Sequence, residues 1–562
     1  MVKLKMLAWT CLLHLAGAQN STYINPMISD WASDPSCIRV DETFFCALST
    51  FIAFPGLPIY ASNDLVSWKL ISHAWNHDSQ LPGFGLQTTN QQGGMYAPNL
   101  RHHEGVFHTT DPFENAAWSD PVIYNSSSID PDLFWDDDGK VYLTSAGIIQ
   151  QEIDLETGNV TEPVNIWNGT GGASPEGPHI YKKDGFYYLM IAEGGTELGH
   201  SVTIARSMNV SGPWESYEKN PVLSNANTTE YFQTVGHADL FQDKNGKWWA
   251  AALSTRSGPE WKIYPMGRES ALTAVTWDEG EWPVFSNVSG IENVWPLPPS
   301  NLSIPGPGAF NDDPDIIDFA PNTSIPSHFY FWRHPAPGTF TVSPAGHPNT
   351  LTITPQPVNL TGIATSNSTA LNGQAGIPFI GRRQTSTLFT FSVDLLPPAL
   401  PSIETGLSVF LTQQDHLDLA ISHNNESLTA TLRLYATPVD TTSNLNKYTE
   451  YQTLATTHAL PPPWRDEKLR LGIWTPNATH YGFTAALAED SNSRVILGYA
   501  EAERVSGRSG RFTGVLLGAY ATCNGAGNGS RCGEQGDAYS SRWRYEDVAQ
   551  YVADGVVGPP KK

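Results

Sequence analysis

The sequence predicts an all-β protein of two domains, a five-bladed β-propeller followed by a β-sandwich. Three observations lead to this prediction. The chain has 562 residues, which is too long for one usual domain. A hairpin pattern recurs five times in its first half, and alternating strands rich in Ser and Thr follow in its second half. The 42 prolines and 48 glycines are spread along the chain, which is typical of many short strands and turns.

The repeated hairpin consists of an apolar strand, a short polar turn and an aromatic-rich strand. Five such hairpins with irregular insertions between them indicate a five-bladed propeller, in which radial repetition protects the edges of the sheets. The five segments are SCIRVDETFFCAL (36–48), NLRHHEGVFHTT (99–110), DLFWDDDGKVYL (132–143), HIYKKDGFYYLMI (179–191) and DLFQDKNGKWWAAAL (239–253).

One register of this repeat carries polar side chains. Nine positions before the equivalent turn residue stand Asp34, Tyr96, Asp130, Glu176 and His237. Equivalent positions at the start of the innermost strands of a propeller converge on its central axis. Because Asp, Glu and His are poor strand and core residues, their recurrence at one register favours a functional site over simple turn-entry residues.

Three carboxylates near one axis suit the hydrolysis of a glycosidic bond. One protonated acid donates to the leaving oxygen, while a second carboxylate activates water or attacks the sugar. A third acid can raise the pKa of the donor through like-charge repulsion. The chain contains no phosphate-binding glycine loop and no G-x-S-x-G motif that would favour another chemistry.

The first 18 residues are predicted to be a signal peptide. Lys3 and Lys5 precede the apolar run 6–15, and Ala16-Gly17-Ala18 predicts cleavage after Ala18. No other apolar run is long enough to span a membrane, so the protein is expected to be secreted, extracellular and free of a membrane anchor. The net charge of −24 also argues against nucleic acid as a partner and suits a neutral ligand.

Cysteines and sequons agree with secretion. Beyond Cys11 in the signal, the chain has Cys37, Cys46, Cys523 and Cys532, and pairing within each close pair is expected. Other connectivities and a zinc site are the alternatives, but the C-x-x-C spacing of zinc ligands is absent. The sequons, expected in a eukaryotic glycoprotein, begin at Asn20, Asn125, Asn159, Asn168, Asn209, Asn227, Asn287, Asn301, Asn322, Asn359, Asn367, Asn425, Asn477 and Asn528.

Several long segments, in order along the chain, carry a family resemblance. They include NPMISDWASDPSC, YAPNLRHHEGVFH, IDPDLFWDDDGKVYL, SPEGPHIYKKDGFYYLMIAEGGTELGHSVTIARS and GHADLFQDKNGKWWAAAL. The chain resembles glycoside hydrolase family 43, in its β-xylosidase and α-L-arabinofuranosidase branch. The resemblance implies a five-bladed propeller and an inverting mechanism, with Asp34 as the base, Asp130 as the residue that tunes pKa and Glu176 as the acid.

The resemblance implies further site residues. Phe54 and Tyr96 are expected to form walls that contact the sugar, and Arg268 to reach it. His237 is expected beneath the pocket, where some relatives bind a calcium ion; no cofactor is expected to be required. The alternatives are core aromatics, a surface ion pair and a hydrogen-bonded core histidine. The chain departs from the family where Tyr96 replaces a common Trp and His77 a common Arg, two positions expected to line the subsites.

The second half is expected to pack against the catalytic rim. Residues 19–320 are assigned to the propeller and 327–555 to the sandwich, which resembles the concanavalin A-like jelly roll of many β-xylosidases of the family. An independent carbohydrate-binding module is the alternative, but no long Pro- or Ser-rich linker separates the halves.

The sequence therefore predicts a secreted, inverting exo-glycosidase that releases terminal β-D-xylosyl or α-L-arabinofuranosyl units from arabinoxylan or its oligosaccharides. The two working carboxyl groups should be roughly 6.5–9.5 Å apart. One alternative is a retaining fructan-type hydrolase, which would carry RDP and EC motifs where this chain has IDP and EG. The other is a sugar-binding propeller without activity.

Overall fold

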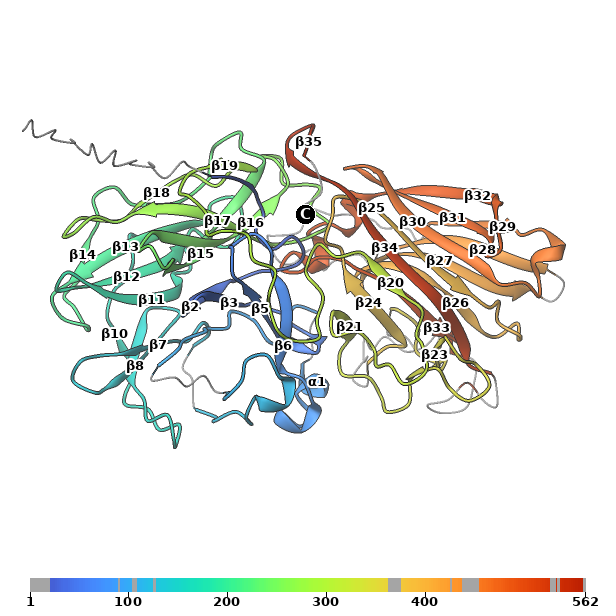
Figure 1. Ribbon diagram of the computed structural model, residues 1–562, viewed down its shortest axis with the longest axis horizontal. Helices are drawn as coiled ribbons and strands as arrows, with labels where there is room; N and C mark the ends of the chain where they lie inside the picture. Colours follow the sequence, from blue (N-terminus) through green and yellow to red (C-terminus); the bar gives the residue numbers. More distant parts are fainter. Residues whose placement is uncertain are drawn as a thin grey trace, which may run out of the picture.

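The computed structural model describes residues 21–88, 91–103, 109–124, 128–361, 376–424, 427–436, 454–525, 532 and 536–558. The predicted signal peptide and its cleavage position lie outside the described residues. Figure 1 shows two lobes side by side, with the first half of the chain in one lobe and the second half in the other.

In the described residues, the first lobe contains four sheets of four antiparallel strands each. Their orders are β2-β3-β5-β6, β10-β9-β8-β7, β11-β12-β13-β14 and β15-β16-β17-β18. The strands are β2 Ser36–Val40, β3 Thr43–Ala47, β5 Gly56–Ser62, β6 Lys69–Trp75, β7 Asp132–Trp135, β8 Val141–Ser145, β9 Ile149–Glu152, β10 Val164–Asn165, β11 Glu176–Lys183, β12 Phe186–Glu193, β13 Ser201–Ser207, β14 Glu215–Ser216, β15 Phe232–Gln242, β16 Trp248–Arg256, β17 Glu269–Thr276 and β18 Val284–Phe285.

Four of the five predicted hairpins are confirmed as the pairs β2/β3, β7/β8, β11/β12 and β15/β16. Two have the expected two-residue turn, whereas β7/β8 and β15/β16 are joined by longer loops, 136–140 and 243–247. The acidic run at 136–138 lies in the first of these loops. The fifth hairpin, 99–110, includes residues 104–108, which are outside the described residues, so the structure confirms a propeller-like arrangement of four sheets.

Apolar and polar residues do not alternate along the inner strands, because these sheets are covered on both faces. In β16 the three alanines Ala250, Ala251 and Ala252 are fully buried, and side chains this small let neighbouring sheets approach closely. The short strand β1 (Thr22–Ile24) pairs with β19 (Ile291–Asn293), so the start of the described chain is tied to the end of this lobe.

The second lobe is a sandwich of two large sheets. One contains β21 Phe329–Trp332, β24 Phe379–Arg383, β26 Glu404–Thr412, β27 Asp415–Asn424, β28 Ser427–Ala436, β29 Leu454–Ala459 and β33 Leu516–Thr522. The other contains β20 Asp315–Ile317, β22 Phe340–Val342, β23 Leu351–Ile353, β25 Leu388–Leu395, β30 Leu469–Asn477, β31 His480–Leu487, β32 Asp490–Glu501, β34 Ala538–Ala553 and β35 Val556–Gly558.

The two lobes share secondary structure. Strand β4 (Ala53–Phe54), from the propeller half, pairs with β21 and extends a sandwich sheet. Strand β20 pairs with β34, so the sandwich also takes in a segment that precedes residue 327. These pairings place the sandwich against the rim of the propeller-like lobe.

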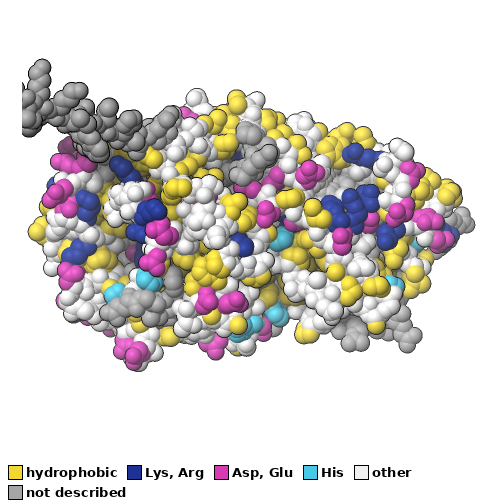
Figure 2. Space-filling model, viewed as in Figure 1, with side chains coloured by type: hydrophobic (Ala, Val, Ile, Leu, Met, Phe, Trp, Pro, Cys, Tyr) yellow, Lys and Arg dark blue, Asp and Glu magenta, His cyan; other side chains and the backbone are white. Residues whose placement is uncertain are grey.

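Helices are short in the described chain and lie in connections. They are α1 Phe84–Gln87, η1 Asp78–Gln80, η2 Asn115–Ala117, η4 Pro462–Trp464, η5 Ala502–Val505 and η6 Arg508–Gly510. No helix in the described ranges is long and apolar enough to cross a membrane. Figure 2 shows acidic and basic side chains interspersed on one face, with Lys and Arg gathered in one cluster on the sandwich lobe.

Both expected disulfides are present. Cys37 pairs with Cys46 across β2 and β3, and Cys523 pairs with Cys532 in the sandwich. The first is buried beneath the polar cluster described below, and the second closes a short loop after β33.

Candidate active site

The residues of the predicted register meet in one cavity of about 260 Å³. Its lining includes all five of them, Asp34, Tyr96, Asp130, Glu176 and His237. Arg268, which precedes β17, also lines the cavity and is only 4 % exposed. Six of the seven site residues expected from the repeat or the resemblance therefore share one pocket, and Phe54 is the exception.

The backbone explains why these side chains converge. At each of the five register positions, either the cavity residue or the residue after it has a left-handed backbone conformation. This conformation is uncommon outside glycine and turns the chain sharply. The φ angles are 55° at Asp34, 55° at Asp130 and 44° at His237, and 47° and 54° at Ala97 and Gly177, which follow Tyr96 and Glu176. Such strained positions persist only where the surroundings hold them, and they concentrate at functional sites.

Asp34 is held by hydrogen bonding rather than by a close ion pair. The Ser49 hydroxyl donates to Asp34 Oδ2 over 2.7 Å, and the Ala97 amide donates to the same Ser49 oxygen over 2.8 Å. His237 Nδ1 lies 3.9 Å from Asp34 Oδ1. The carboxylate is thus fixed in direction and nearly buried, at 7 % exposed.

Glu176 has the electrostatics of a general acid. Burial raises the pKa of its carboxyl to about 7, and the charges of Asp130 and Asp34 add to the rise against the opposing charges of His237 and Arg268. Near neutral pH about half of the Glu176 carboxyls are therefore protonated, which is the state that a proton donor needs.

Asp130 lies beside both other acids. Burial raises its pKa, and the charge of Asp34 acts in the same direction, while His237 opposes. Its Oδ2 accepts a hydrogen bond of 3.1 Å from the Gly177 amide, directly after Glu176. Asp130 is thereby tied to the strand that carries Glu176, in a place suited to orienting the Glu176 carboxyl.

His237 lines the cavity beside Gly177. A Cβ added at Gly177 would lie 2.9 Å from His237 Nε2, so the imidazole packs directly on that glycine. Although burial lowers the pKa of His237, the charges of Asp34, Asp130 and Glu176 outweigh it and raise the pKa above its usual value. Among the described residues, no group of three or more His, Cys, Asp or Glu side chains could hold a metal ion.

An aromatic wall forms one side of the cavity. Phe51 stacks on Tyr96, with ring centroids 5.5 Å apart, and on Phe512, with centroids 6.1 Å apart. The guanidinium of Arg268 lies 4.5 Å from the Phe512 ring centroid. Phe512 belongs to the connection between η6 and β33, so the sandwich supplies one face of the pocket.

Phe54, expected to contact the sugar, does not line this cavity. Phe54 is in β4, whose pairing with β21 draws it into the sandwich sheet, where its ring packs edge-on against Trp75 and His334. Phe51, three residues earlier, lines the cavity in its place. His77 also lies outside the cavity lining, because it caps η1 and hydrogen-bonds to Ser79.

His200 is a cavity residue that the sequence prediction missed. Burial lowers its pKa to about 3, so the ring is neutral. Nδ1 donates to the Thr234 carbonyl over 2.9 Å, which leaves Nε2 as an acceptor with no hydrogen-bonding partner in the described parts of the chain. The segment TELGHS contains it, but a single histidine in such a segment carries no signal of its own.

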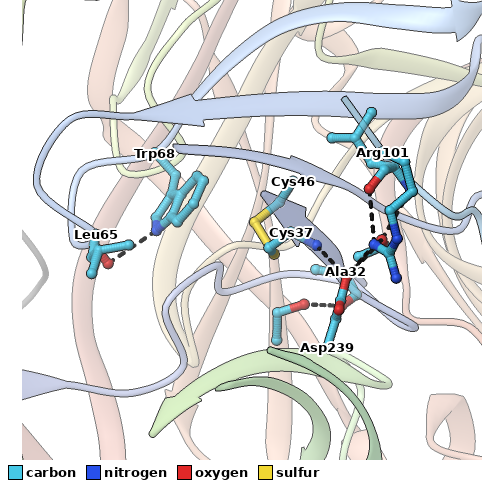
Figure 3. Close-up of a disulfide and its surroundings, with 10 residues drawn as sticks. Ala32, Cys37, Cys46, Leu65, Trp68, Arg101 and Asp239 are labelled. Carbon is cyan, nitrogen blue, oxygen red and sulfur yellow. Dashed lines mark hydrogen bonds and ion pairs between the residues drawn. A yellow bond between two sulfur atoms is a disulfide. The ribbon is translucent and has the colours of Figure 1, made fainter. Parts of the chain in front are cut away.

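A second buried cluster is centred on Asp239. Asp239 accepts hydrogen bonds from the Cys37 amide over 3.1 Å and from Arg101 Nη1 over 3.0 Å (Figure 3). Arg101 Nη2 lies 2.9 Å from Asp132. Despite burial, Arg101 and its neighbours hold the pKa of Asp239 at about 2. Asp132, two residues after Asp130, thus joins a structural ion-pair network.

A larger, mainly apolar cavity of about 490 Å³ adjoins the first and shares Tyr96 and Ala97 with it. It lies between the sheet of β2–β6 and the sheet of β7–β10, with Trp75 on one side and Leu133 on the other.

Comparison with known proteins identifies the two halves. Residues 23–283 match the model of glycosyl hydrolases family 43, and residues 317–533 match the β-xylosidase C-terminal concanavalin A-like domain. A non-reducing end α-L-arabinofuranosidase from Bacteroides ovatus is 35 % identical over 548 residues, which cover 92 % of this chain and 94 % of the relative. A β-xylosidase from Bacillus subtilis is 35 % identical, but over 46 % of this chain and 56 % of the relative.

Solved structures agree. A Bacteroides ovatus family 43 protein of a xyloglucan locus superimposes with a TM-score of 0.77 at 32 % identity, over 94 % of this chain and 99 % of the other. A xylan β-1,4-xylosidase from Bacillus halodurans has a TM-score of 0.76 at 26 % identity, over 93 % and 100 %. The chain is a glycoside hydrolase and belongs to glycosyl hydrolase family 43.

Proposed function

We propose that the protein is a secreted, inverting exo-glycosidase that removes one terminal pentose, α-L-arabinofuranosyl or β-D-xylosyl, from hemicellulose oligosaccharides. The observation that carries the proposal is the pairing, in one small cavity, of a carboxyl with a pKa of about 7 (Glu176) and a carboxylate held by a hydroxyl (Asp34). Glu176 can donate a proton and Asp34 can receive one from water, so the two groups can perform the two halves of the reaction.

Glu176 is the general acid in this proposal. Its proton passes to the glycosidic oxygen as the bond to the anomeric carbon breaks, so that the leaving group departs as a neutral alcohol. Asp130 keeps the pKa of Glu176 high by repulsion and fixes the adjoining backbone through the Gly177 amide.

Asp34 is the general base. It accepts a proton from the water that attacks the anomeric carbon on the face opposite the leaving group, which inverts the configuration. The Ser49 hydroxyl directs one carboxylate oxygen, so the other is left to bind the water. His237 and Arg268 stabilise the negative charge that remains on Glu176 after proton transfer.

The size of the cavity supports exo action. At about 260 Å³ it is smaller than the pockets of roughly 300–1,000 Å³ that hold drug-sized ligands, so it suits a single sugar ring. Phe512 and Tyr96 would flank that ring, and the imidazole of His200 would lie in the wall beside it.

Arabinofuranosyl is the favoured glycone. The relative that matches nearly the whole chain cleaves non-reducing end α-L-arabinofuranosyl units, whereas the B. subtilis β-xylosidase matches about half of its own length. The kcat/KM of the enzyme should be higher on 4-nitrophenyl α-L-arabinofuranoside than on 4-nitrophenyl β-D-xyloside. The proposal would be contradicted if the enzyme hydrolysed another glycoside but neither of these pentosides.

Export and a complete propeller are part of the same proposal. The described sequon asparagines are exposed apart from half-buried Asn359, and two disulfides are formed, as expected in an oxidising compartment. We assign Tyr96 to the fifth blade position, since it shares the register of the other four and is followed by a residue with left-handed backbone, Ala97.

Activity should fall as the pH rises through about 7. Glu176 works only while protonated, and its pKa is about 7, so kcat/KM should drop about tenfold per pH unit above that value. In Asp130→Asn the repulsion is lost and the pKa of Glu176 falls, so this limb should move to lower pH. The loss relative to the parent should therefore be larger at pH 7 than at pH 5. A pH–rate profile whose alkaline limb stays in place would contradict the role of Asp130.

A further inference from the structure

Arg383 is a buried charge at the junction of the two lobes. It ends β24 in the sandwich and is 2 % exposed, yet its guanidinium reaches into the propeller half. Nη1 lies 3.6 Å from Asp30 Oδ1, and the guanidinium carbon lies 5.0 Å from the centroid of the Trp31 ring. The Tyr330 ring of the sandwich covers it from another side, with its centroid at 4.6 Å.

The hydrogen bonds of Arg383 converge on the segments that hold Asp34. Nη1 donates to the carbonyl of Trp31, and Nη2 donates to the carbonyl of Ser49 over 3.2 Å. The Ser49 amide donates to the Ser33 carbonyl over 3.1 Å, and the Ser49 hydroxyl donates to Asp34 over 2.7 Å. One guanidinium thus links the chain just before Asp34 to the serine that directs its carboxylate.

The hydrogen bonds of Arg383 help to hold the backbone of Asp34 in an unfavourable conformation. Asp34 has a φ of 55°, a conformation that costs free energy and persists only where its surroundings impose it. Two N–H groups of one rigid plane can hold two carbonyls at a fixed separation. A lysine presents one compact charge on a flexible stem and does not bridge them with the same precision.

We propose that Arg383 is a positioning residue, which reaches from the sandwich to clamp the carbonyls of Trp31 and Ser49 and so sets the direction of the Asp34 carboxylate. The inference rests on the proposed role of Asp34 as the base. It gives the sandwich a part in the chemical step in addition to the wall that Phe512 provides.

Arg382 supplies a matched control. It precedes Arg383 in the same strand and is 4 % exposed, but its hydrogen bonds, its ion pair and its ring contact are with residues of the sandwich. Nη1 lies 3.0 Å from Asp315, Nη2 donates to Thr385, and the guanidinium carbon lies 3.8 Å from the Tyr545 ring centroid. Arg382→Met removes a buried charge from the same sheet without touching the Asp34 segments.

The test compares kcat and KM of the full chain, Arg383→Met, Arg383→Lys and Arg382→Met on the better aryl pentoside, with Tm measured for each. A misplaced base should lower kcat of Arg383→Met by about 100-fold while KM stays within about threefold. Arg383→Lys should have a kcat between those of Arg383→Met and the parent. It also provides the test if the Arg383→Met variant does not fold. Arg382→Met should lower Tm but keep kcat within about twofold.

The Asp34→Asn/Arg383→Met double variant separates positioning from general damage. If Arg383 acts through Asp34, the double variant should be no slower than Asp34→Asn, because the base is already lost. Parent-like kcat in Arg383→Met, equal losses in Arg382→Met, or independent losses in the double variant would overturn the proposal. An Asp34→Asn variant with parent activity would instead refute the proposed base itself, a result distinguishable because it does not involve Arg383.

Discussion

Glu176→Gln is expected to lower kcat on pentose oligosaccharides by about 10²–10⁴-fold, the usual contribution of a general acid. The amide has the shape of the carboxyl but no acidic proton, so the sugar alkoxide must leave unprotonated. The loss should be much smaller on a 2,4-dinitrophenyl pentoside, because that leaving group departs readily as an anion. Steady-state kinetics on both substrates measure the difference.

Glu215→Gln is the control for this prediction. Glu215 is in β14 of the same sheet, with a side chain 65 % exposed, and its partner is Arg206 rather than a cavity residue. Its kcat should match the parent on both substrates. Equal losses of Glu176→Gln on good and poor leaving groups would show that Glu176 does not donate the proton.

Asp34→Asn should lower kcat by about 10²–10⁴-fold on every pentoside, whatever its leaving group. The attacking water has to lose a proton in each case, and the asparagine side chain accepts none at neutral pH. Its carbonyl oxygen can still accept the Ser49 hydrogen bond, so the fold and KM should change little. Kinetics on the 4-nitrophenyl and 2,4-dinitrophenyl pentosides distinguish this uniform loss from the selective loss in Glu176→Gln.

Asp137→Asn provides the matched control. This aspartate lies in the loop after β7, with a side chain 87 % exposed, and contacts Lys182. It should leave kcat unchanged. If Asp34→Asn kept activity on the dinitrophenyl pentoside alone, Asp34 would have the pattern of an acid and the two assignments would have to be exchanged.

The site residues within the repeat could be predicted because their spacing is local. Asp34, Asp130, Glu176 and His237 each stand a fixed distance before a hairpin turn, and strand geometry carries that spacing into space. The hairpins themselves follow from turn residues and aromatic strands, so four of them were confirmed. The fifth stays a prediction, since part of it lies outside the described residues.

Residues brought together by long-range packing could not be predicted. Phe512 is more than 400 residues from Phe51, and nothing local marks it as a wall of the cavity. Phe54 was placed wrongly because β4 joins a sandwich sheet, a pairing between residues 53–54 and 331–332 that no short pattern encodes. Likewise, the sequence alone does not distinguish Arg383 from the adjacent arginine in the same strand. The distinction comes from its hydrogen bonds to distant carbonyls, such as that of Ser49.

The configuration of the first sugar released tests the central claim most directly. Proton NMR can follow the hydrolysis of an aryl pentoside in its first moments, before mutarotation. The released sugar should be the anomer opposite to that of the substrate. The reason is that Asp34 activates a water molecule that attacks the anomeric carbon from the face away from Glu176. Release of the same anomer as the substrate would mean a covalent intermediate, with the two carboxyl groups about 5 Å apart, and would contradict the assignment of Asp34 as a base.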